Sequence, residues 1–212
     1  MELEKLVQLF IYTHATFGGI ALLTGGITLS VKKGQNVHKK SGIVFFYTMF
    51  ISALMAFIIS VLPNHESPFL FAIGLFSAYF LLTGYRSLKF RQPDYSLKTD
   101  KIISSLIIVT GTTMIFYPLL FQGKINSVLL IFGLVGIVFG IKDLILFKNR
   151  ERLQKSWLKL HLGKMTGGYI SAVSAFFVVN NILPGLWNWF VPGIVGSIFI
   201  TYWMFKIKPT QK

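Results

Sequence analysis

The sequence has no cysteine, and this absence removes several kinds of chemistry at once. Disulfides, iron–sulfur clusters, thiolate zinc sites and cysteine nucleophiles all need thiols that the chain lacks. Acidic residues are also scarce, with seven Asp and Glu against 21 Lys and Arg, and there are only four histidines. No nucleotide-binding loop, long linker or low-complexity tract interrupts the 212 residues. The groups able to carry acid–base, metal or cofactor chemistry are therefore few.

Apolar residues dominate the rest of the chain. Hydrophobic residues make up 53% of it and charged residues only 13%. Apolar runs of about 20 residues recur along the whole length, and a run of that length crosses a bilayer as a helix. We therefore predict an all-α polytopic membrane protein, with residues 1–212 forming a single membrane domain. The expected bundle has seven transmembrane helices, near residues 6–30, 42–62, 68–87, 101–121, 127–147, 160–182 and 187–206.

The basic residues gather in alternate loops between these runs. Of the 21 Lys and Arg, all but Lys5 and Lys124 fall on one side of the expected membrane. By the positive-inside rule that side is cytoplasmic, which places the N-terminus outside and the C-terminus inside a bacterial inner membrane. This distribution explains the net charge of +14 without nucleic acid, and the basic loops are expected to contact anionic headgroups. No protein partner can be named from the sequence.

Two histidines carry the same local pattern, a glycine four residues later. The pairs are His14 with Gly18 and His38 with Gly42. Residues four apart share one face of a helix, so each glycine clears space beside its histidine for a ring or a neighbouring backbone. His14 is expected within the first helix, where an ionisable group is by default a functional hypothesis. His38 is expected in the basic loop before the second helix.

Two further polar groups are expected near the cytoplasmic side. His161 is expected at the start of the sixth helix, and Asp143 lies about one turn from the end of the fifth. The plainest interpretation of Asp143 is an ion pair with the adjacent Lys142 that reaches the interface. His65, in the outer loop, is expected to be solvated.

The order of three segments resembles a family of predicted multi-pass membrane proteins of unknown function from Bacteroidetes-type bacteria. The segments are HATFGGIALLTGGITLSVKKGQNVHKKSGIVFFYTMF, SAYFLLTGYRSLKF and WLKLHLGKMTGGYISAVSAFFVVN. The family's first histidine–glycine pair corresponds to His14 and Gly18, its second to His38 and Gly42, and a third histidine to His161. The resemblance covers nearly the whole chain and implies the topology, but it implies no activity.

Haem b binding is the first of three hypotheses for function. His14, His38 and His161 are the candidate ligands, and Gly18 and Gly42 would let a porphyrin lie against a helix. Such a protein would transfer electrons or handle haem. The layout loosely resembles cytochrome b561-type proteins, by architecture alone. Those proteins carry their ligands within helices, whereas His38 is expected in a loop.

The other two hypotheses use different residues or none. His38, Asp143 and His161 are of the right types for a zinc site, for example in an intramembrane hydrolase. The chain lacks the compact two-histidine helix motif of many such enzymes. The third hypothesis is a transporter or an accessory subunit without chemistry, which fits the glycine-rich helices. The sequence leaves open whether the protein is an enzyme.

Overall fold

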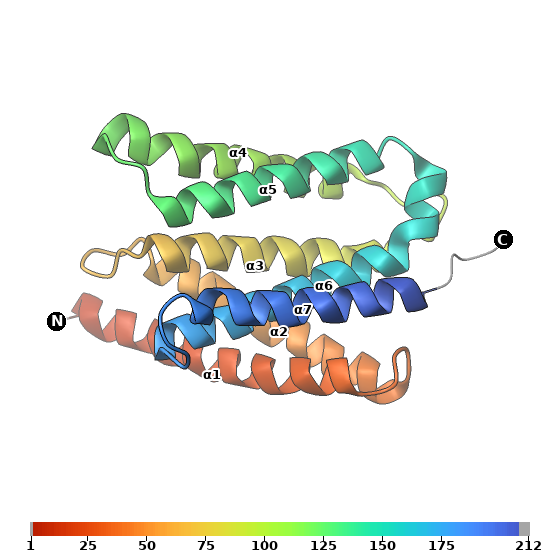
Figure 1. Ribbon diagram of the computed structural model, residues 1–212, viewed down its shortest axis with the longest axis horizontal. Helices are drawn as coiled ribbons and strands as arrows, with labels where there is room; N and C mark the ends of the chain where they lie inside the picture. The colour runs from red at the N-terminus through yellow and green to blue at the C-terminus, as the bar shows by residue number, and fades with distance from the viewer. Residues whose placement is uncertain (1, 208–212) are drawn as a thin grey trace.

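The structure, a computed structural model, describes residues 2–207 (Figure 1). Over these residues it is all-α, and each of its seven long helices is long and apolar enough to cross a membrane, which confirms the predicted fold class. A short 3-10 helix, η1 (Ser87–Lys89), follows the third helix. The α-helices are α1 (Glu2–Ser30), α2 (Asn36–Ile59), α3 (Pro68–Arg86), α4 (Lys98–Gln122), α5 (Ser127–Leu146), α6 (Arg150–Asn180) and α7 (Trp187–Lys206).

The helices run up and down beside one another, as Figure 1 shows. α1 packs mainly on α2, and α2 also packs on α3. α3 packs on α6, and α6 also packs on α7. α4 and α5 form a hairpin that packs on α3 from the other side. α1 begins at one end of the bundle and α7 finishes at the other, as an odd number of spans requires. Which end faces the cytoplasm stays a prediction.

One end of the bundle carries most of the basic residues, and we call it the basic end. The α1–α2, α3–α4 and α5–α6 connections lie there, together with the last turn of α7. These segments and the helix turns next to them include Lys32, Lys39, Lys89, Lys98 and Lys206. The charge pattern that predicted the topology thus corresponds to one physical end of the structure.

Local signals explain several helix ends. The Ser67 hydroxyl accepts a hydrogen bond from the Leu70 amide at 3.2 Å, and the Asn126 side chain accepts one from the Leu129 amide at 3.1 Å. Each bond satisfies an amide that the first helical turn leaves without a partner. Gly123 ends α4 with φ at 61°, a left-handed conformation that glycine adopts without steric cost.

Aromatic side chains fill the interior between the helices. One core joins α1, α2, α3 and α6, and its fully buried members are Ala21, Phe45, Phe46, Met49, Leu81 and Ala172. A second joins α3 to the α4–α5 hairpin around Phe76, Tyr79, Phe80 and Ile107. The outer surface is also apolar, with side chains such as Leu23 and Phe121 exposed. An apolar exterior is what lipid, rather than water, would cover.

Two helices begin at least six residues earlier than the sequence predicts, at Asn36 instead of 42 and at Arg150 instead of 160. The early start of α6 has a visible cause. The Asn149 side chain accepts a hydrogen bond from the Arg152 amide at 2.9 Å, and Leu153 is fully buried against Phe90 and Phe147. The basic stretch that was expected to be a loop is therefore a packed helical extension, because alternating charges hid its one apolar face.

Candidate functional site

Two histidines lie near each other at the basic end of the core formed by α1, α2, α3 and α6. The His38 ring comes from α2 and the His161 ring from α6, and they are near enough to influence each other electrostatically. His38 Nδ1 donates to the Thr28 carbonyl at 3.1 Å, and His161 Nδ1 donates to the Gly84 carbonyl at 2.9 Å. A carbonyl only accepts, so each of these bonds places a proton on Nδ1 and leaves Nε2 as the ring nitrogen that could bind a metal.

The position of His38 corrects the sequence analysis, which placed it in a loop. α2 begins at Asn36, so His38 stands in its first turn. The Thr28 hydroxyl donates to the Ser41 hydroxyl at 2.7 Å, which ties the end of α1 to this turn. His161 also moves from a helix start to a helix interior, because α6 begins at Arg150. Both rings are therefore held on regular helices, as ligands in a helical bundle are.

His14 occupies a separate position on the α1–α2 interface. Its Nδ1 donates to the Ser52 carbonyl at 2.9 Å, and the Ser52 hydroxyl donates to the His14 carbonyl at 3.0 Å. Ser52 is buried, so His14 turns toward α2 and anchors a polar contact between the two helices. No contact joins His14 to His38 or His161 in the described part of the chain.

The two glycines of the repeated pattern lie beside residues of the neighbouring helix. A Cβ on Gly18 would lie 3.0 Å from the Ser52 hydroxyl oxygen, so Gly18 makes room for the group that contacts His14. A Cβ on Gly42 would stand 3.5 Å from Thr28, an ordinary van der Waals distance. Of the two interpretations left open, this contact favours a neighbouring helix beside Gly18.

Asp143 belongs to a buried polar cluster, which corrects its expected pairing with Lys142. Its carboxylate forms an ion pair with Lys164 of α6 and accepts hydrogen bonds from Tyr79 at 2.6 Å and Ser104 at 3.3 Å. Lys164 also donates to the Tyr79 hydroxyl at 3.1 Å. We call Tyr79, Ser104, Asp143 and Lys164 the intramembrane cluster. It joins four helices, α3 to α6.

The predicted zinc set of His38, Asp143 and His161 is not assembled. Among the described residues, no three His, Asp or Glu side chains gather closely enough to hold a metal ion. The physical reason is that the Lys164 ammonium and the Tyr79 hydroxyl occupy the Asp143 carboxylate from α6 and α3. His65, the fourth histidine, lies 3.4 Å from Glu4 at the end of the bundle opposite the basic end.

A second ion pair lies beside the intramembrane cluster. Arg86, in the last turn of α3, donates to both carboxylate oxygens of Asp100 at 2.8 and 2.9 Å. Asp100 stands in the first turn of α4, is only 1% exposed, and also acts electrostatically on Lys164. Two acids and two bases therefore neutralise each other in this part of the protein. A paired arrangement is the form in which membrane interiors hold charge.

Sequence reasoning missed Lys164, Tyr79, Ser104 and Asp100. Lys164 was counted among the basic loop residues, yet it is 7% exposed. One signal was present: Lys164 stands three residues after His161, in a stretch that turns apolar from Met165 onward. A lysine at such a place needs a buried acid, and Asp143 is the single acidic residue between Asp100 and Glu151.

Comparison with known proteins supplies a family but no activity. The sequence profile of a family described as predicted membrane protein (DUF2306) matches residues 11–141. This range contains His14 and His38, and it ends two residues before Asp143 and before α6 begins. The comparisons with curated proteins and with solved structures found no match.

Proposed function

The chain belongs to the DUF2306 family of predicted membrane proteins, and we propose that it binds a b-type haem through His38 and His161. Such a protein would transfer electrons or handle haem at the basic end of the bundle. The observation that supports the proposal is that two histidines, one on α2 and one on α6, lie near each other with both Nδ1 atoms bonded to backbone carbonyls. Histidines that ligate a metal almost always carry such a bond on the other ring nitrogen.

The residues around His38 and His161 are compatible with a bound haem. α2 and α6 meet through aromatic side chains, with the rings of Phe45 and Tyr169 5.9 Å apart between centroids, so the neighbouring core is apolar. Lys39 and Lys40 follow His38 directly and are exposed at the basic end, where they would meet the haem propionates. The bound group would supply one-electron chemistry, while the chain supplies two imidazoles and a largely apolar surrounding.

The absorption spectrum of the purified full-length protein tests this proposal. We expect a Soret band and sharp bands after dithionite reduction, in protein expressed with haem supplied during growth. His38→Ala and His161→Ala should each remove the low-spin spectrum, because each deletes one of the two residues that would hold the haem. A colourless wild-type protein under these growth conditions contradicts the proposal.

Matched controls come from the two other histidines. His65→Ala, at the opposite end, and His14→Ala, whose ring contacts Ser52, should both keep the full spectrum if the variants remain folded. Loss of the bands in His14→Ala, with bands retained in His161→Ala, would assign the ligands differently and overturn the pairing proposed here.

The intramembrane cluster favours a second candidate, an ion-coupled transporter. Ionisable residues within a membrane commonly mark proton or ion pathways, and Asp143 with Lys164 is such a pair. In liposomes with an internal pH dye, the wild-type protein should then move protons in response to a pH gradient. Asp143→Asn should abolish that flux, while Lys142→Gln on the exposed side of α5 should not. Equal flux in empty liposomes and in liposomes with the wild-type protein excludes this candidate.

A further inference from the structure

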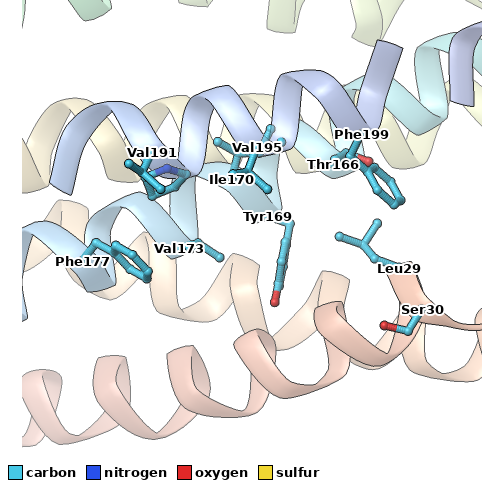
Figure 2. A pocket seen from close by; sticks show the side chains of 12 residues that line it. Leu29, Ser30, Thr166, Tyr169, Ile170, Val173, Phe177, Val191, Val195 and Phe199 are labelled. Atoms are coloured by element: carbon cyan, nitrogen blue, oxygen red, sulfur yellow. The ribbon is translucent and has the colours of Figure 1, made fainter. Parts of the chain in front are cut away.

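An elongated groove runs between α6 and α7 and reaches the end of α1 (Figure 2). Its volume is about 300 Å³, and apolar side chains such as Leu29, Phe177, Val191 and Phe199 form most of its lining. The lining follows α6 from Thr166 to Phe177, which corresponds to about 16 Å at the rise of an α-helix. About half the hydrocarbon thickness of a bilayer is thus available, parallel to the helices.

The basic end of the groove is bordered by cations. Lys33 Nζ, from the α1–α2 connection, lies 5.6 Å from the ring centroid of Phe199 and 5.0 Å from that of Trp203. Lys206 Nζ lies 5.3 Å from the same Trp203 ring. Phe199 lines the groove, so an ammonium group stands directly at its mouth. Basic groups beside an apolar space between membrane helices are the arrangement that binds anionic lipid headgroups.

A polar side chain in the groove gives independent evidence for a ligand. Thr166 is 3% exposed and lines the groove next to Phe199 (Figure 2). Threonines elsewhere in the helices, such as Thr24 and Thr48, donate to a carbonyl one turn back. The Thr166 hydroxyl has no hydrogen bond within residues 2–207. The Thr166 oxygen keeps accessible surface in the groove, so a ligand oxygen that reaches it there could accept its hydrogen bond.

We propose that this groove holds one acyl chain of an anionic phospholipid, with the phosphate at Lys33. The length and apolar lining of the groove match a chain rather than a flat ring. The ester region of the lipid lies below the phosphate, at the level where Thr166 can donate to an ester oxygen. The bound lipid would lie at the same depth as the surrounding lipids, because its headgroup would be at the same interface as the basic loops.

Native mass spectrometry of the detergent-purified full chain, titrated with phosphatidylglycerol or phosphatidylcholine, tests the proposal. We expect tighter binding of phosphatidylglycerol. Lys33→Gln should reduce that preference about fivefold, since one lysine near anionic lipid contributes about 1 kcal/mol. Lys32→Gln removes the same charge from the same connection without the contact to Phe199, and it should leave the preference unchanged.

Two more variants separate the groove from a general attraction to the basic end. Val195→Phe places a larger side chain in the groove from an exposed position of α7 and should lower the affinity for both lipids. Thr166→Val keeps the shape and removes the hydroxyl, and it should weaken binding of phosphatidylglycerol. Thermal unfolding confirms that each variant is folded. Equal binding of the two lipids by the wild-type protein, or full binding by Val195→Phe, overturns the proposal.

Discussion

Replacing Lys164 with methionine is expected to destabilise the protein by about 3–5 kcal/mol, because it leaves the Asp143 carboxylate buried without its counter-charge. Asp143 is 5% exposed and lies within the bundle, where water cannot replace the ammonium group. The hydrogen bonds from Tyr79 and Ser104 remain, but they do not supply a positive charge. Thermal unfolding in detergent, followed by tryptophan fluorescence, measures the change.

Lys142→Met is the matched control for this variant. Lys142 directly precedes Asp143 and is exposed, so its loss removes one positive charge near Asp143 without breaking the buried ion pair. Its melting temperature should stay close to that of the wild-type protein. A Lys164→Met variant as stable as Lys142→Met would show that the carboxylate is protonated or solvated, contrary to the buried ion pair.

Removing both partners of the pair separates charge from packing. A double variant, Asp143→Leu with Lys164→Met, leaves no buried charge, and replacing a whole buried pair by apolar side chains is often neutral or stabilising. The double variant should therefore recover much of what Lys164→Met loses. If haem bands or proton flux disappear in a double variant that is folded and stable, the cluster has a functional role besides its structural one.

The sequence predicted the architecture well, because length and hydropathy alone decide whether a helix can cross a membrane. Each of the seven helices contains the apolar run that predicted it, apart from up to three residues at some C-terminal ends, and the basic loops gather at one end. The partners within the bundle were harder to predict. Lipid and core are both apolar, so the hydrophobic pattern does not show which face of a membrane helix is buried. Asp143 was therefore assigned to its neighbour Lys142 rather than to Lys164 in the next helix.

For the histidines too, the sequence indicated which residues matter but not which groups they contact. Sequence patterns selected His14, His38 and His161 as candidates. In the structure, each of these rings is hydrogen-bonded to a backbone carbonyl of another helix. The proximity of His38 and His161 depends on α6 packing on α3 beside α2, and no local pattern encodes that arrangement. The helical start at Asn36 was missed because lysines at 39 and 40 and the polar residues before them resemble a loop.

The seam between α4 and α5 leads to the second large expected effect. The two backbones touch at Gly111 and Gly133: a Cβ on Gly111 would lie 2.7 Å from the Gly133 carbonyl oxygen, and a Cβ on Gly133 would lie 2.6 Å from the Gly111 carbonyl oxygen. Real Cβ atoms essentially never approach a backbone atom so closely. Gly133→Ala must therefore push the helices apart, at a cost of about 1–3 kcal/mol, as overpacking does.

Gly193→Ala in α7 provides the opposite case. A Cβ on Gly193 meets nothing within 4 Å, so alanine should keep or raise stability, because it is the better helix former by about 1 kcal/mol. Both variants replace glycine with alanine within a helix, so the difference between their melting temperatures removes the effect of helix propensity. What remains is the cost of the close contact between α4 and α5. A Gly133→Ala variant as stable as Gly193→Ala would contradict the close approach of α4 and α5.

The seam also links packing to the intramembrane cluster. One face of α5 carries Gly133, Gly140 and Asp143, and a Cβ on Gly140 would lie 2.7 Å from the Ser104 carbonyl oxygen. Ser104 donates to Asp143, so the close approach of α4 also sets the distance between those two groups. Gly140→Ala should therefore lower stability by more than Gly133→Ala, because it disturbs both the helix contact and the polar cluster. If the two variants lose the same stability, Ser104 contributes nothing to holding Asp143.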